Sequence, residues 1–354
     1  MRHTRISLAT CCAIALAFSA AEASAQKIIY NLTSPTPTVA EAPHASVPAA
    51  LGFWKESGLD VQVNPVNGST LATQLVAAGT AQFAMPTVEP VIGARQQGGK
   101  IIAVYNHTRE PIYTIAVPAN SSITQLAQLK GKRIGVLSLS SGAVPFAKAM
   151  LAGAGLDPER DVSWLPIGIG SQAAQAVQNN QVDALGYWDW GYAVLENAGL
   201  SFRHFTTEET KDLLSLMIIG NEDFVKANPD VAMKLAQGIA KATLFTINNP
   251  EAAVRIHWEH YPQSKPTGVP EEVALKQAVH VLSARLEKYR IDRRAIPKWG
   301  AFTEAEWRES QDFLLKSGIA SKSMDVKTYY TDQFIDKIND FDQAAIVAKA
   351  KAYK

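Results

Sequence analysis

Residues 65–86 (PVNGSTLATQLVAAGTAQFAMP) and residues 166–187 (PIGIGSQAAQAVQNNQVDALGY) share one pattern, and this repeat decides the fold. At a constant offset of 101 positions, the two copies share a proline, an aliphatic residue, an alanine, a glutamine and a valine. A Gly-Ser pair also occurs in both, at Gly68 and Ser69 and again at Gly170 and Ser171. Each copy predicts the end of a strand, a Gly-Ser turn, an amphipathic helix and a short buried strand, which together make half of a βαβ unit.

The segments that precede the two copies are also similar. KIIYNLTS (27–34) and KRIGVLSLSSG (132–142) both read as a strand that runs into a loop of small polar residues. Helices are predicted over 44–57 and 142–154, followed by SGLD and AGLD. Two unrelated helix-turn-strand units could match by chance, but the similar preceding segments favour two similar α/β lobes.

The first 25 residues have the pattern of a secretory signal peptide. Arg2 and Arg5 form a basic start, residues 6–21 form an apolar run, and Ala23 and Ala25 provide the small residues of a cleavage site. The alternative is a membrane anchor, but this run is short for a span of about 20 residues. We expect a periplasmic protein that begins at Gln26.

Cysteine content and charge exclude several classes of protein. Cys11 and Cys12, the two cysteines of the chain, lie in the predicted leader, so the exported protein would have no thiol for disulfides, metal binding or catalysis. Without the leader the formal net charge is zero, which offers no basic face for nucleic acid. HWEH (257–260) lacks the spacing of a metal-binding HExxH motif and is expected on a helix surface. Neither a metal nor a cofactor is predicted.

The remaining chain is predicted to complete two lobes. Residues 222–350 read as almost continuous helix, with Asn221 as the N-cap of the first segment and a stop at Pro250. We expect these helices to pack on the first lobe. The predicted division is residues 26–112 and 217–354 for lobe 1, and 113–216 for lobe 2.

Several segments resemble a known family, in this order and at this spacing. They are LGFWKESGLDVQVNPVNGS (51–69), QLVAAGTAQFAMPTVEPVI (74–92), LAQLKGKRIGV (126–136), NNQVDALGYWD (179–189) and the helical segment 223–254. The chain resembles the periplasmic solute-binding proteins of ABC importers, in the nitrate/sulfonate/taurine group with its thiamine-pyrimidine-binding relatives. The resemblance implies a two-lobed type II periplasmic binding protein fold, with hinge crossings near 113–117 and 203–217. It also implies a monomer whose partners are a small-molecule ligand and the transmembrane subunits of an ABC permease with their ATPase.

Ligand contacts are expected where strands end and helices begin, because helix N-termini present unpaired N–H groups and binding crevices lie beyond the carboxyl ends of strands. His44 is included because it matches the place of a histidine in the related pyrimidine binders. The predicted ligand-binding residues are Thr36, Thr38, His44, Gly68, Ser69, Thr87, Glu89, Ser140, Ser141, Gly142, Trp188 and Asp189.

The stretch GYWDWG (186–191) suggests what these residues bind. We predict that Trp188 stacks on the ligand, while Asp189, opposite Glu89, accepts hydrogen bonds from a ligand N–H or cationic nitrogen. In the alternative, Asp189 caps a helix, Trp188 and Trp190 fill the core, and His44 is an ordinary surface histidine.

The sequence therefore predicts an extracytoplasmic solute-binding component of an ABC importer that captures an amino- or heterocycle-bearing solute, with or without an anionic end. The same scaffold could instead bind a sulfonate, nitrate or an aromatic carboxylate. An enzyme of the pyrimidine-biosynthesis type is the alternative of a different class. The predicted mature chain contains no G-x-S-x-G, P-loop or G-x-G-x-x-G motif, so no catalytic role is expected.

Overall fold

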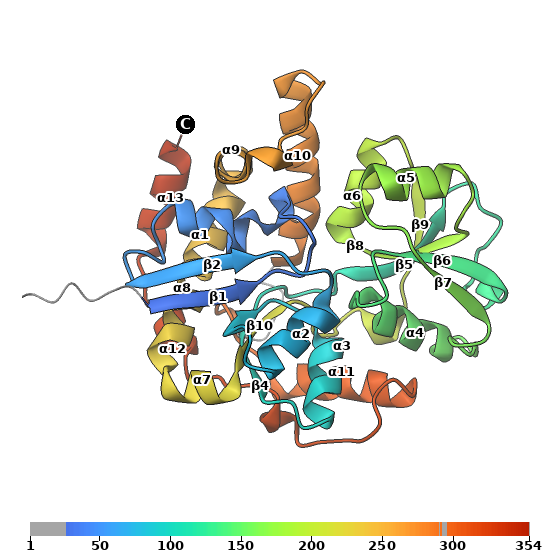
Figure 1. Ribbon diagram of the computed structural model, residues 1–354, viewed down its shortest axis with the longest axis horizontal. Coiled ribbons are helices and arrows are strands. Elements are labelled where there is room, and N and C mark those ends of the chain that lie inside the picture. The colour runs from blue at the N-terminus through green and yellow to red at the C-terminus, as the bar shows by residue number, and fades with distance from the viewer. Residues whose placement is uncertain (1–25, 290, 292–295, 354) are drawn as a thin grey trace, which may run out of the picture.

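The computed structural model describes residues 26–289, 291 and 296–353, so the predicted signal peptide lies outside the described residues. Two lobes, each built on a five-stranded sheet, lie side by side (Figure 1). The first sheet has the spatial order β2 (Leu59–Asn64), β1 (Gln26–Asn31), β3 (Phe83–Ala84), β10 (Met217–Asn221) and β4 (Ile101–Asn106). The second has the order β7 (Val162–Pro166), β6 (Lys132–Val136), β8 (Ala184–Trp188), β5 (Tyr113–Pro118) and β9 (Phe202–Phe205).

The two sheets are built in the same way, which confirms the prediction of two similar α/β lobes. In the first sheet β1 pairs in parallel with β2 and β3, and β10 lies antiparallel between β3 and β4. In the second sheet β6 pairs in parallel with β7 and β8, and β5 lies antiparallel between β8 and β9. The repeated sequence forms α2 (Ser69–Ala77) before β3 and α5 (Ser171–Gln178) before β8.

Other helices of the two lobes follow the strand ends. They are η1 (Val39–His44), α1 (Ser46–Ala50) and α3 (Val88–Gln96) in the first lobe, and η2 (Leu126–Leu129), α4 (Ala143–Gly153), α6 (Asp189–Asn197) and η3 (Glu208–Thr210) after β5. The single helix predicted over 44–57 is wrong, because η1 and α1 are short and turns follow them to residue 58. Pro43 lies inside η1, and Gly52 has a φ of 77°, a conformation that ends a helix.

The C-terminal helices pack mainly on the first lobe, as predicted. They are α7 (Glu222–Ala227), α8 (Pro229–Asn248), α9 (Pro250–His260), η4 (Pro262–Ser264), α10 (Glu271–Leu286), η5 (Glu287–Tyr289), α11 (Glu304–Lys316), η7 (Val326–Thr328), α12 (Ile335–Asn339) and α13 (Gln343–Ala352). Helix α8 packs on η1 and α1, and the Trp54 indole donates to the carbonyl oxygen of Leu235 at 3.1 Å. Two of the helices also reach the second lobe, since α10 packs on α6, and α11 contacts both α3 and α4.

The chain crosses between the sheets at residues 107–112 and 206–216. The predicted first crossing at 113–117 is wrong, because these residues form β5 and pair with β8 and β9. The predicted second crossing at 203–217 contains the observed one. HWEH is also placed differently from the prediction, since His257 is fully buried and lies 3.0 Å from the Ser46 hydroxyl.

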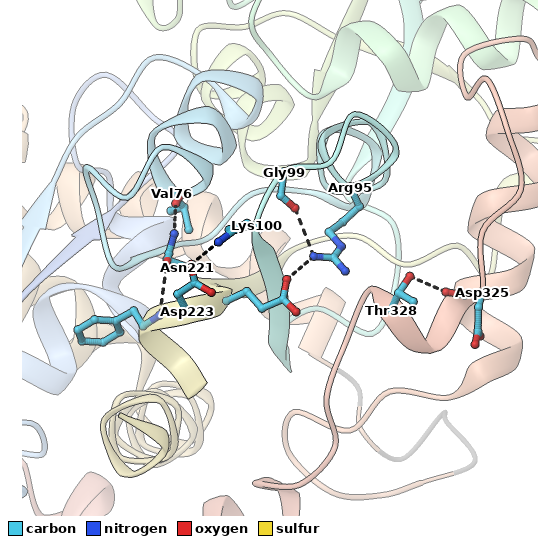
Figure 2. A network of polar contacts seen from close by, with 10 residues as sticks. Val76, Arg95, Gly99, Lys100, Asn221, Asp223, Asp325 and Thr328 are labelled. Carbon is cyan, nitrogen blue, oxygen red and sulfur yellow. Dashed lines mark hydrogen bonds and ion pairs between the residues drawn. The ribbon is translucent and has the colours of Figure 1, made fainter. Parts of the chain in front are cut away.

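Polar contacts fix the point where the chain enters the C-terminal helices (Figure 2). The Asn221 side chain accepts from the backbone N–H of Phe224 at 3.1 Å, which confirms its N-cap role, and donates to the carbonyl oxygen of Val76 at 3.1 Å. Arg95 of α3 forms an ion pair with Glu222 at 2.5 Å. The first turn of α7 is therefore tied to both α2 and α3. No helix within the described ranges is long and apolar enough to cross a membrane.

Candidate ligand-binding cleft

A small cavity of about 30 Å³ lies between the two lobes, and both lobes provide its walls. Loops and helix N-termini of the first lobe face the strand ends of the second, and α10 covers one side. The lining residues are Thr33, Ser34, Glu41, His44, Gly68, Ser69, Met85, Ile112, Tyr113, Leu137, Ser141, Trp188, Trp190, Leu216 and Arg285.

The lobes touch directly beside this cavity, at the N-terminus of α2. The backbone N–H of Thr70 donates to the Ser140 carbonyl oxygen at 3.0 Å, and the Ser140 hydroxyl donates to the carbonyl oxygen of Asn67. Gly68 has a φ of 106°, and a Cβ at this position would lie 2.5 Å from the Ser140 oxygen. A glycine is therefore required for the lobes to approach this closely.

Aromatic side chains form the wall from the second lobe. Trp188, at the end of β8, stacks on Tyr187 with ring centroids 4.8 Å apart and meets Trp190 edge-on at 5.0 Å. The indole N–H of Trp188 is buried and has no hydrogen-bond acceptor among the described residues. A Cβ on Gly191 would lie 2.9 Å from the Trp188 ring, so the small residue after Trp190 leaves space for this arrangement.

Two ionisable side chains of the first lobe reach the cavity from η1. Glu41 is 3% exposed, accepts from the backbone N–H of Thr38 at 2.9 Å, and has its pKa raised to about 7 by burial. His44 lies 3.0 Å from the Tyr30 hydroxyl, and burial lowers its pKa to about 3. At neutral pH the imidazole is therefore uncharged, while the Glu41 carboxyl lies close to its titration midpoint.

An ion pair joins α10 to the second lobe at the edge of the cavity. The guanidinium of Arg285 donates from Nε to one oxygen of Asp189 at 2.6 Å and from Nη2 to the other at 2.7 Å. The Arg285 and Asp189 side chains are 3% and 4% exposed. Asp189 begins α6, where it also accepts from the backbone N–H of Trp190 at 2.8 Å. The charge of Arg285 is thus matched within the protein.

The structure brings part of the predicted set together. His44, Gly68, Ser69, Ser141 and Trp188 line the cavity, and His44 is 3% exposed, which excludes the surface alternative.

The other predicted residues lie outside this lining. Thr36 is exposed and Thr38 precedes η1, while Ser140 and Gly142 face the first lobe. Their roles in ligand binding stay predictions.

Two acidic residues were predicted to face one another, and neither lines this cavity. Asp189 pairs with Arg285, and Glu89 lies in the first turn of α3 and lines a different cavity. Thr87 is the N-cap of α3, the position that Trp188 occupies in α6. A ligand role for Asp189 and Glu89 therefore stays a prediction.

Sequence reasoning missed Glu41, Tyr113 and Arg285. A signal existed for Glu41, a lone charge within the buried segment VAEAPH. Arg285 carried no comparable signal, because it lies 96 residues from Asp189 in a helix with many charges. Within the described part of the chain, no group of three or more His, Cys, Asp or Glu side chains is placed to hold a metal ion.

A family model described as NMT1/THI5 like matches residues 45–253. The formylaminopyrimidine-binding protein of Halalkalibacterium halodurans is 24% identical over 209 residues, which are 58% of this chain and 62% of the relative. The riboflavin-binding protein RibY of Chloroflexus aurantiacus is 25% identical over 304 residues, 84% of this chain and 83% of the relative. A 4-amino-5-hydroxymethyl-2-methylpyrimidine phosphate synthase of Saccharomyces cerevisiae is 25% identical over 231 residues, 61% of this chain and 65% of the relative. The chain thus spans less than two thirds of the pyrimidine-related relatives.

Solved structures share the fold. The alkanesulfonate-binding protein SsuA of Xanthomonas axonopodis pv. citri, bound to MOPS, superimposes with a TM-score of 0.63 at 16% identity, covering 86% of this chain and 98% of that one. The periplasmic nitrate-binding protein NrtA of Synechocystis PCC 6803 superimposes with a TM-score of 0.60 at 14% identity, covering 93% and 98%. At this identity the likeness establishes the two-lobed periplasmic binding protein fold.

Proposed function

The chain belongs to the NMT1/THI5-like family, and from this premise we propose that it is the extracytoplasmic solute-binding component of an ABC importer, specific for a planar solute that carries N–H groups. The observation that carries the proposal is the pairing of a Trp188–Trp190 wall with the buried carboxyl of Glu41 in one interlobe cavity. The solute would pass from this cleft to the transmembrane subunits of the importer.

The charges in the cleft favour a nitrogen-bearing solute. Because Asp189 already accepts from both Nε and Nη2 of the Arg285 guanidinium, the cation is not left to attract an anion. Glu41, in contrast, can accept hydrogen bonds from an amino group or a ring N–H, and such a partner stabilises the ionised carboxylate. An anion such as nitrate would meet this carboxylate, although an anionic end of a larger solute could lie at the N-terminus of α2.

Binding requires the lobes to separate. A volume of about 30 Å³ holds about one water molecule, whereas small-molecule pockets have volumes of about 300 to 1,000 Å³. We propose that residues 107–112 and 206–216 act as hinges. They join lobe 1, which is predicted to contain residues 26–112 and 217–354, to lobe 2, which is predicted to contain residues 113–216. Small-angle scattering should then show a smaller radius of gyration when ligand is added, because ligand favours the closed arrangement.

The names of two relatives support the ligand class. One is a formylaminopyrimidine-binding protein and the other a riboflavin-binding protein, so both names specify a nitrogen heterocycle. Fungal relatives are named as synthases, which makes an enzyme of this family the alternative. We propose a binding role in the periplasm, in which the solute is released unchanged.

A thermal-shift screen tests the proposal. The chain from Gln26 is screened against aminopyrimidines, flavins, alkanesulfonates, nitrate and aromatic carboxylates, because a ligand at 100 times its Kd stabilises the folded state by about 2.7 kcal/mol. We expect nitrogen heterocycles to raise the melting temperature. Stabilisation by sulfonates or nitrate alone would contradict the proposed ligand class.

Calorimetry on a confirmed ligand then tests the role of Glu41. Glu41→Gln should weaken binding by about tenfold or more, because a charged acceptor is lost. Glu56→Gln, which changes an exposed carboxyl of the same lobe, should bind like the wild type. Mass spectrometry of the recovered ligand should show an unchanged compound, and a product would establish the enzyme alternative.

A further inference from the structure

A second and larger cavity, of about 440 Å³, also lies between the lobes. Most of its lining residues come from α2 and α3 of the first lobe, from α4 of the second, and from the end of α11 with the residues up to Ala320. It shares no lining residue with the first cavity. Its volume lies in the range of small-molecule pockets, about 300 to 1,000 Å³.

A wall of closely packed side chains separates the two cavities. Thr87 lies at the start of α3, and a Cβ on Gly142 would lie 2.3 Å from its hydroxyl and 2.7 Å from that of Tyr113. Tyr113 lines the first cavity, and Glu89, two residues after Thr87, lines the second. The two cavities therefore have separate linings that are adjacent at Thr87 and Tyr113.

Glu89 provides a buried carboxyl in the wall of this second cavity. It is 6% exposed, and its Oε2 atom is buried without a hydrogen bond of ordinary geometry among the described residues, although the Thr87 side chain lies close enough to act on its pKa in the lowering direction. The cation that also lines the cavity, Lys148, forms an ion pair with Glu159. Burial raises the pKa of Glu89 to about 7, as expected for a carboxyl removed from water. Buried polar groups in folded proteins nearly always have partners, so this one requires an explanation.

The other walls define the kind of molecule that would fit. Ile92, Leu314, Ile319 and Val144 provide apolar surface, and Gln74 and Gln97 provide amides. We propose that this cavity is a second binding site, which takes a small organic cation whose ammonium or amidinium group pairs with Glu89 and whose apolar body packs between α3 and α11. The inference does not depend on which ligand occupies the first cleft.

Occupation of the second site would act on both lobes at once. Its walls come from α2, α3 and α11 on one side and from Val144, Pro145 and Lys148 of α4 on the other. A molecule that contacts both lobes favours the arrangement in which they lie together. The cation would thus raise the affinity of the first cleft for its own ligand, and the reverse holds by linkage.

Calorimetry with benzamidine as the probe tests the site, with benzamide as its uncharged analogue. We expect the chain from Gln26 to bind benzamidine, and to bind benzamide at least about tenfold more weakly, because the charged hydrogen bond is lost. Glu89→Gln should weaken benzamidine binding by a similar factor. Gly93→Phe should abolish benzamidine binding. Gly93 lines the cavity in the middle of α3, and a Cβ added there would meet no atom within 4 Å. The new ring can therefore enter the cavity and fill it.

Two further variants separate this site from the first cleft. Because benzamidine is planar and carries N–H groups, it can also enter the first cleft, so Glu41→Gln should remove any binding event at that cleft and keep the event that Glu89→Gln weakens. Glu56→Gln, an exposed control, should keep both. Circular dichroism shows whether each variant is folded. Absence of saturable binding at millimolar probe, equal binding of benzamidine and benzamide, full binding by Glu89→Gln, or loss of all benzamidine binding in Glu41→Gln would each overturn the proposal.

Discussion

Truncation of Asp189 should destabilise the protein strongly, because it leaves the Arg285 guanidinium buried without its partner. Both side chains are almost fully buried, at 4% and 3% exposure, and share two hydrogen bonds of 2.6 and 2.7 Å. Removing one member of a buried ion pair costs about 3 to 5 kcal/mol. A domain has a free energy of unfolding of about 5 to 15 kcal/mol, so Asp189→Ala should remove a large fraction of it.

Urea denaturation followed by circular dichroism measures this cost. Asp189→Ala, Arg285→Met and the double variant form a thermodynamic cycle, and the double variant should be more stable than the sum of the single effects predicts. A coupling free energy of about 2 kcal/mol or more is expected for a pair with this geometry. Trp188→Phe serves as a control that changes the residue next to Asp189 without removing a charge.

The same variants test the ligand role predicted for Asp189. If Asp189 binds ligand, Asp189→Ala should lower the affinity more than Trp188→Phe does, beyond any effect of unfolding. If Asp189→Ala melts early and binds normally, the carboxylate is structural. Equal stability of Asp189→Ala and the wild type, or a coupling free energy near zero, would refute the assignment of a stabilising ion pair between α10 and α6.

Three further predictions follow from single contacts. Gly68→Ala should weaken ligand binding and enlarge the particle in small-angle scattering, because its Cβ would lie 2.5 Å from the Ser140 oxygen. Glu89→Gln should become more stable than the wild type as the pH rises from about 4.5 to 7, by up to about 3 kcal/mol in urea titrations. The folded protein keeps Glu89 protonated over this range because its pKa is raised to about 7. The unfolded chain ionises from about pH 4.5, so the wild type loses stability and the variant does not. Arg95→Ala should cost at least about 1 kcal/mol, whereas Lys100→Ala, whose ion pair is 65% exposed on both sides, should destabilise the protein less (Figure 2).

The sequence predicted the parts of the fold that depend on local patterns. The repeated Gly-Ser turn, helix and short strand form α2 with β3 and α5 with β8, because turn residues and helical periodicity act within about 20 positions. Asn221 was also predicted as an N-cap, a local signal. The first hinge was misplaced because residues 113–117 pair with β8 and β9, which lie far away in the sequence, and this pairing could be known only from the assembled sheet.

The site was predicted less well, because its chemistry depends on contacts between distant segments. The reasoning from strand ends and helix N-termini named Ser69, Ser141 and Trp188, and these residues line the interlobe cavity. The side-chain directions around α3 could not be predicted in the same way, because successive residues of a helix point about 100° apart. Thr87 and Glu89, two positions apart, therefore reach different surroundings, and Glu89 lines the second cavity.

The first cleft combines a repeated framework with unrepeated ionisable groups. Both lobes provide a strand end and a helix N-terminus to the lining of the cavity, and the second lobe adds the aromatic rings of Tyr113, Trp188 and Trp190. Glu41 comes from η1 and Arg285 from α10, and the described part of the second lobe has no helix equivalent to α10. Glu41 takes no part in the strand pairing, so a substitution there changes the charge of the cleft without changing the sheets, whereas a substitution of Arg285 leaves Asp189 buried without its partner. Because Asp189 already matches the charge of Arg285, we expect selection among solutes to depend on Glu41, and a change at Glu41 should alter ligand class while the two lobes still fold.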